Sequence, residues 1–63
     1  MKRRAIYVGT PMKRIGPFNS NLYLGYGMTG IVVYADRLVS RFCSDDGNEW
    51  YVSTFDLYYG SNS

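Results

Sequence analysis

Apolar and polar residues alternate over several short stretches of the chain, and no helical period is sustained anywhere. Four of these stretches are rich in β-branched or aromatic residues: 5–8, 29–34, 38–43 and 49–52. Tyr58 and Tyr59 are expected to form a last short strand. The pattern therefore predicts an all-β protein made of four or five short strands.

Two connections have the composition of tight turns. Residues 44–48 are all small or polar and include Asp45, Asp46 and Gly47, which tolerates a positive φ, so we expect a hairpin turn there. Residues 53–57 are too few for a stable α-helix and predict one 3₁₀ turn, with Ser53 or Thr54 as its cap.

The segment 11–26 differs from the rest of the chain. It contains both prolines, and its apolar residues are spaced too irregularly for a helix. We expect a long, partly ordered loop with one extended segment at residues 22–24.

Strict alternation assigns the faces of the two strongest neighbouring strands. Arg41 should face solvent, and Tyr51 should lie beside it on the same outer face. The inward side chains are then Leu38, Phe42, Trp50 and Val52. Some of Tyr7, Phe18 and Phe55 are also expected in the core. So short a sheet covers both of its faces only by curling into a small barrel.

Composition supports a single folded domain over residues 1–63. Aromatic residues make up 17% of the chain, which is too many for a disordered tail. No apolar run approaches the roughly 18 residues that a membrane-spanning helix needs. The basic N-terminus is followed by Gly9 and Pro11, so we expect no signal peptide.

The absence of histidine and the presence of one cysteine restrict the chemistry. They exclude an internal disulfide, the usual zinc sites, and catalytic triads or Cys–His dyads. General acid–base catalysis usually needs a histidine or two carboxylates in a cleft. We therefore expect no enzyme, no catalytic residue, no metal and no cofactor. A lone Cys43 without a secretory signal fits the reducing cytoplasm.

The second half of the chain resembles a known class of small barrels. Gly27, Gly30 and Val32 form a Gly-x-x-Gly-x-Val step, followed by a hairpin and then by Leu57. This order resembles the Src-homology-3-like barrels of the KOW and related bacterial or phage kind. The resemblance covers residues 27–59 and implies a five-stranded barrel with a long first loop. It also implies a 3₁₀ turn before the last strand, with Leu57 plugging the barrel.

Two features depart from that pattern. Ser40 stands where such barrels usually have an aliphatic residue, and residues 11–26 lack the acidic cluster of proline-peptide-binding members. Polyproline recognition is therefore not inferred. This barrel supports many unrelated activities, so the resemblance implies a fold more than a function.

Charge is divided unevenly along the chain. Residues 1–35 hold five cations and no acid, whereas residues 36–63 hold two cations and five acids. The basic end, with Lys13 and Arg14 as candidates, suits phosphates or an acidic patch on a protein.

The tyrosines supply the second candidate surface, since a domain this small cannot bury them all. Tyr and Arg concentrate at protein interfaces, although stacking on bases or packing across a wet sheet would use the same residues. The predicted partner-binding residues are Lys13, Arg14, Tyr23, Tyr26, Tyr34, Arg41 and Tyr51.

These observations favour a small non-enzymatic module that binds a macromolecule, most simply a protein, and no membrane. The resemblance suggests a phage-type modulator of a host protein, acting in the host cytoplasm. Two alternatives stay open: an RNA- or DNA-binding barrel of the KOW-like kind, and a structural subunit of a homo-oligomer.

Overall fold

Residues 2–60, the part of the chain that the computed structural model describes, form seven strands and two 3₁₀ turns. The strands are β1 (Arg3–Tyr7), β2 (Met12–Ile15), β3 (Asn21–Leu24), β4 (Thr29–Ala35), β5 (Val39–Ser44), β6 (Glu49–Ser53) and β7 (Leu57–Tyr58). The 3₁₀ turns are η1 (Pro17–Asn19) and η2 (Thr54–Asp56). The predicted all-β class is confirmed. Residues 2–60 contain no helix long and apolar enough to cross a membrane.

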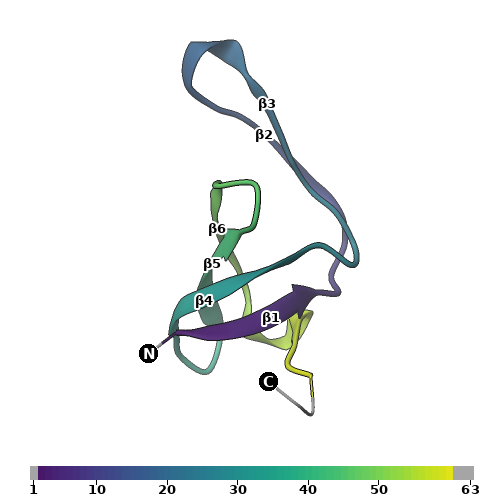
Figure 1. The fold of residues 1–63 in the computed structure, drawn as a ribbon, viewed down its shortest axis with the longest axis vertical. Coiled ribbons are helices and arrows are strands. Elements are labelled where there is room, and N and C mark those ends of the chain that lie inside the picture. The colour runs from purple at the N-terminus through teal and green to yellow at the C-terminus, as the bar shows by residue number, and fades with distance from the viewer. Residues whose placement is uncertain (1, 61–63) are drawn as a thin grey trace.

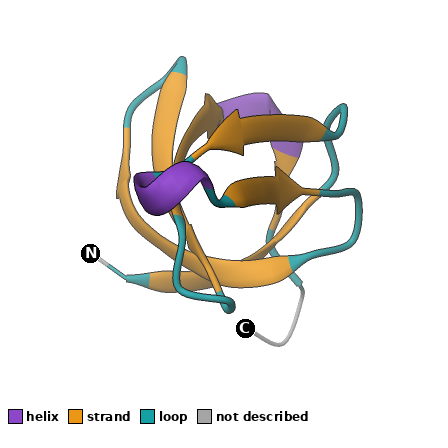
Figure 2. Ribbon diagram, turned by 90° about the horizontal axis from the view of Figure 1, so that it is seen from above, coloured by secondary structure: helices purple, strands orange, loops and turns teal. Residues whose placement is uncertain are grey.

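Five strands make one antiparallel sheet in the order β6-β5-β4-β1-β7, and β2 pairs only with β3 (Figure 1). Seen from above, the sheet curls into a half-barrel (Figure 2). Within residues 2–60 no strand pairing joins β6 to β7, so the ladder stays open where full closure was expected. The turn η2 connects these two edge strands along the chain. Its predicted cap is confirmed, because the Ser53 hydroxyl accepts a hydrogen bond from the Phe55 N–H.

The core lies on the inner face of this curl. Its buried apolar members are Ala5, Tyr7, Leu24, Val32, Phe42, Trp50, Val52 and Leu57. Alternation correctly predicted Phe42, Trp50 and Val52, because β5 and β6 are regular strands in this part of the sheet. Tyr7 is buried as well, and its hydroxyl donates to the Thr10 carbonyl at 2.6 Å. Burial, with a smaller effect of Asp56, raises the pKa of the Tyr7 phenol.

Three aromatic or aliphatic residues expected inside are exposed. Leu38 is 67% exposed because β5 begins one residue later, which leaves Leu38 in the turn. Phe55 is exposed because it lies in η2, outside the alternation of β6. Phe18 is fully exposed at the end of the β2–β3 hairpin. The prediction for Leu38 was wrong. Of Tyr7, Phe18 and Phe55, some of which were expected in the core, Tyr7 alone is buried.

The segment 11–26 is an ordered hairpin, which corrects the expected loop. Met12 lies opposite Leu24, and Arg14 lies opposite Leu22, so these four side chains share one face. That face packs on the core through Leu24, Leu22 and Met12. The extended segment at 22–24 is confirmed within β3. The far end of the hairpin rises away from the sheet (Figure 1), and the molecule measures 36 × 20 × 19 Å.

Two glycines are required by the backbone around β4 and β5. A Cβ on Gly30 would lie 2.4 Å from the Cys43 carbonyl oxygen on the neighbouring strand. Gly47 has φ +94°, which confirms the predicted hairpin turn between β5 and β6. The first glycine permits close approach of two strands, and the second permits the chain to reverse.

Ser40, the departure noted in the sequence, is buried and hydrogen-bonded. Thr54 Oγ1 donates to the Asp36 carbonyl at 2.7 Å, so its single proton is already used. Ser40 Oγ must then donate to Thr54 Oγ1, 2.8 Å away. Ser40 therefore fills less of the core than an aliphatic residue would, but its buried hydroxyl has a hydrogen-bond partner.

We expect Ser40→Ala to lower the free energy of unfolding by about 1 kcal/mol, the usual net value of one hydrogen bond. Thr54 keeps its bond to Asp36, so no buried donor is left unpaired. Urea denaturation measures the change, with Ser53→Thr as a control that retains the hydroxyl at the η2 cap. A loss above about 3 kcal/mol would contradict this role for the Ser40 hydroxyl.

Candidate functional site

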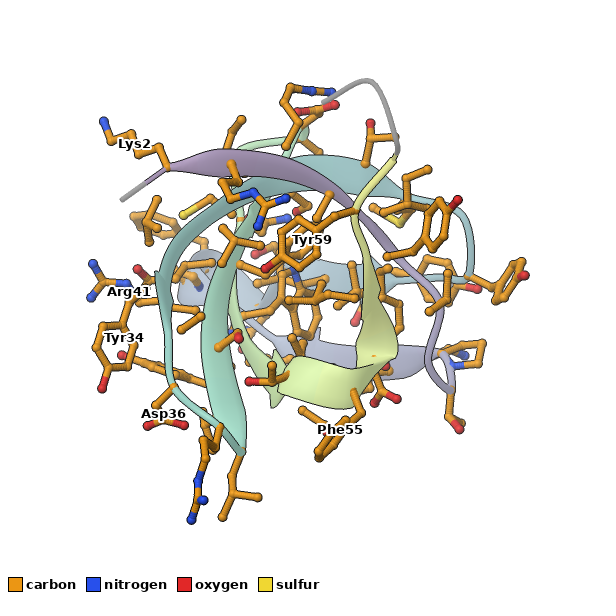
Figure 3. All side chains as sticks on the ribbon, turned by 90° about the horizontal axis from the view of Figure 1, so that it is seen from below. Lys2, Tyr34, Asp36, Arg41, Phe55 and Tyr59 are labelled. Carbon is orange, nitrogen blue, oxygen red and sulfur yellow. The ribbon has the colours of Figure 1, made fainter. Side chains whose placement is uncertain are left out.

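Three side chains predicted to bind a partner stand in one line across the sheet. Tyr34 of β4 lies opposite Arg41 of β5, and Arg41 lies opposite Tyr51 of β6. Residues directly opposite each other in an antiparallel pair share a face. Figure 3 shows Tyr34 and Arg41 side by side and pointing away from the body of the protein. We call Tyr34, Arg41 and Tyr51 the tyrosine–arginine row.

A β-bulge in β4 brings Tyr34 into this row. The register between β4 and β5 shifts between Val32 and Tyr34, so Val33 is an extra residue. Without the shift, Val33 would lie opposite Arg41, and Tyr34 would face the inside of the curl opposite Ser40. The bulge re-aims the tyrosine to the outer face, as bulges beside functional sites often do.

Two carboxylates contact side chains of the row, one at Arg41 and one at Tyr34. Arg41 Nε lies 3.1 Å from Glu49 Oε2, with both side chains about half exposed. Tyr34 Oη donates to Asp36 Oδ2 over 3.4 Å. The second Asp36 oxygen accepts from the N–H groups of Val39 and Leu38, and these bonds hold the pKa of Asp36 below its usual value. Arg41 and Tyr34 are therefore held in place before any partner arrives.

Exposed apolar side chains border the row. Val39 lies two residues before Arg41 on β5 and so shares its face, and it is exposed. Leu38 is exposed in the adjoining turn. Two tyrosines and an arginine beside apolar area have the composition of energetically dominant interface residues.

The other four predicted residues lie elsewhere. Lys13 and Tyr23 face each other on the exposed side of the β2–β3 hairpin. Arg14 is on the opposite side of that hairpin, where its guanidinium carbon lies 4.5 Å from the centroid of the Trp50 ring. Tyr26 is exposed in the turn between β3 and β4. The seven residues are therefore divided among the sheet, the hairpin and the turn between β3 and β4, and three of them form the row.

An open groove of about 420 Å³ runs along the hairpin. It is lined by Lys13, Arg14, Ile15, Asn21, Leu22 and Tyr23. Sequence reasoning had found the two cations and the tyrosine but not Ile15 or Asn21, because it treated this segment as an irregular loop.

Most of the arginines contact groups of the protein itself. Arg4 makes two hydrogen bonds to Asp45, of 3.0 and 3.2 Å. The guanidinium carbon of Arg3 lies 4.1 Å from the centroid of the Tyr59 ring, and Arg14 stacks on Trp50 as described. With Arg41 beside Glu49, four arginines in the described part of the chain are engaged and form no continuous basic stripe.

The contact between Arg4 and Asp45 predicts an acid sensitivity. Hydrogen bonds from the Arg4 guanidinium and then from the Thr29 hydroxyl hold the pKa of Asp45 below its usual value. Because the pKa of Asp45 is lower in the folded state than in the unfolded state, its ionised form stabilises the fold at every pH above the unfolded-state pKa of about 3.9. This stabilisation is lost as the pH falls through the folded-state pKa.

We therefore expect Asp45→Asn to flatten the fall in the thermal midpoint below about pH 4. Thermal unfolding from neutral to strongly acidic pH measures this, with Asp46→Asn as the control one residue away. An acid limb as steep in Asp45→Asn as in the unaltered protein would contradict the assignment.

Within residues 2–60, no three His, Cys, Asp or Glu side chains come together as a metal site. Cys43 is partly buried and lies opposite Ile31 and Glu49.

Sequence reasoning missed several residues that define the surfaces. Glu49 and Asp36 position the row, and Val39 extends it. Phe18 was counted among the candidates for the core. It stands between Pro17 and Asn19 in a run with turn composition, a signal that could have placed it outside.

Comparison of the chain with protein-family models, with curated proteins and with solved structures finds no match in any of the three. The function is therefore argued from the residues of the protein itself.

Proposed function

We propose that this protein is a non-enzymatic binding module that docks a protein partner on the tyrosine–arginine row. The observation that carries the proposal is the alignment of Tyr34, Arg41 and Tyr51 on three adjacent strands. Tyrosine buries a large area with few rotatable bonds to immobilise, and the planar guanidinium of arginine donates several hydrogen bonds. The partner covers the row and the neighbouring Val39, and polar groups at the rim surround this centre.

A protein fits the surface better than a nucleic acid does. Glu49 and Asp36 lie beside the row and would repel phosphates. Four arginines already contact acidic or aromatic groups of the protein. A nucleic-acid surface usually presents a basic stripe along a groove, and neutralised phosphates supply most of its affinity.

The proposed fold is the Src-homology-3-like barrel that the sequence resembles. Three features support it: the strand order β6-β5-β4-β1-β7, the long β2–β3 hairpin between β1 and β4, and η2 between β6 and β7. Leu57, expected to plug the barrel, is buried at the end of η2. The same resemblance suggests a phage-type modulator of a host protein in the host cytoplasm as the setting.

The proposal is tested by capturing the partner from the native cell with the tagged protein, with and without nuclease. We expect a protein to be retained after nuclease, and its affinity to change less than about tenfold between 50 and 200 mM salt. Six phosphate contacts would cost about a thousandfold over that range. Loss of capture after nuclease would instead support the nucleic-acid alternative, and self-association over a concentration series would support the homo-oligomer.

A further inference from the structure

The tip of the β2–β3 hairpin presents an aromatic ring entirely to solvent. Phe18 is the most exposed of the large apolar side chains in the described part of the chain. It stands at the end of a hairpin that projects from the sheet (Figure 1). A phenylalanine ring in water is less favourable than a buried one, so a surface that covers the ring would gain free energy. Exposed apolar side chains of this kind often mark interaction sites.

The backbone fixes this presentation. Phe18 has φ 58° and ψ 32°, and Asn19 has φ 57°, so both residues are in the left-handed region. That conformation is rare for a bulky residue such as Phe and is strained. Three hydrogen bonds hold the turn: Gly16 N–H to the Ser20 carbonyl at 2.8 Å, Ser20 N–H to the Pro17 carbonyl at 3.1 Å, and Ser20 Oγ to that same carbonyl at 2.7 Å. The ring is therefore presented on a closed turn.

The exposed side of the hairpin continues from this tip. The register places Lys13 opposite Tyr23 and Ile15 opposite Asn21, so these four side chains share the face turned away from the core. Ile15 is 66% exposed, and these four residues line the open groove of about 420 Å³ together with Arg14 and Leu22 of the other face. Lys13 supplies the charge of this face, and residues 1–35 contain no Asp or Glu.

We propose that the hairpin is a second docking site, which packs Phe18 against apolar side chains of a protein segment whose carboxylates lie opposite Lys13. A buried phenylalanine removes about 150–250 Å² from water, enough for an interface anchor. Holding the backbone of the turn in place beforehand lowers the entropic cost of binding. Lys13 makes this face positive, and a positive face favours an acidic partner surface. The site shares no residue with the tyrosine–arginine row, so it does not rest on the function proposed above.

The test uses the full chain as bait for a random peptide display library. We expect the selected peptides to combine acidic residues with an apolar one. Their synthetic forms should lose about tenfold or more in affinity with Phe18→Ser and with Lys13→Glu. Phe55→Ser is the matched control, because Phe55 is also an exposed phenylalanine but lies on η2. It should leave the affinity unchanged within about twofold.

Several results would overturn the proposal. Selected peptides that bind Phe18→Ser as tightly as the unaltered protein, peptides without acidic residues, or no selected peptide at all would each do so. Phe18-dependent binding to phosphatidylcholine–phosphatidylserine vesicles would assign the tip to a lipid surface instead. Phe18-dependent self-association in sedimentation would assign it to a second copy of the chain. Peptides that respond to Arg41→Ala and not to Phe18→Ser would belong to the row.

Discussion

Replacing Phe42 by alanine is expected to leave the chain largely unfolded at room temperature. Phe42 is fully buried, and it lies between Val32 of β4 and Trp50 of β6 in the sheet register. Removing a buried phenyl ring costs about 3–5 kcal/mol. A core in a chain of this size supplies only about 3–5 kcal/mol in total. The loss therefore equals the whole stability of the fold.

Little can refill the space that Phe42 would leave. Its Cζ approaches to 2.7 Å of the position that a Cβ on Gly30 would occupy, so that side of the ring faces backbone. Circular dichroism and urea denaturation measure the effect. Phe55→Ala, which removes an exposed ring, should change stability by less than about 0.5 kcal/mol. A cooperative transition in Phe42→Ala at the midpoint of the unaltered protein would show that the core is not centred there.

The second large effect concerns binding. We expect Tyr51→Ala and Arg41→Ala each to weaken binding of the protein partner by at least about 2 kcal/mol, or roughly 30-fold. Tyr51 is exposed and Arg41 half exposed, so the loss should appear in affinity rather than in folding. Arg41→Ala also frees Glu49 at the edge of the row, which adds an unpaired carboxylate to the interface.

Tyr58→Ala is the matched control for the row. Tyr58 is similarly exposed, but it lies on β7 at the opposite edge of the sheet. Its removal should leave the affinity unchanged, as measured by isothermal titration calorimetry at fixed salt. Unchanged affinity in both Tyr51→Ala and Arg41→Ala would remove them from the interface.

The features that sequence predicted correctly are local ones. In residues 49–52 the identity of each residue alternates with the faces of a regular strand, so Trp50 and Val52 could be placed inside and Tyr51 outside. The same reasoning placed Arg41 and Tyr51 side by side, and the register confirms it. The cap of η2 depends on a hydroxyl two residues from its donor, which is equally local.

The features that the sequence did not predict depend on contacts between distant residues or on backbone conformation, and the alternation of apolar and polar residues indicates neither. The bulge at Val33 changes the face of Tyr34, and only the pairing with β5 reveals it. The hairpin β2–β3 forms although its sequence is irregular, because one of its faces packs on the core. Phe18 was one of three aromatic candidates for the core, and it lies outside in a left-handed turn.

Amide chemical-shift mapping tests the central claim most directly. The ¹⁵N-labelled protein is titrated with the captured partner after nuclease treatment. The row predicts that the largest shifts gather at the end of β4 and at the facing residues of β5 and β6, around Tyr34, Arg41 and Tyr51. The claim would be contradicted if a saturating concentration of the partner left the chemical shifts of those amides unchanged while the shifts of other amides changed.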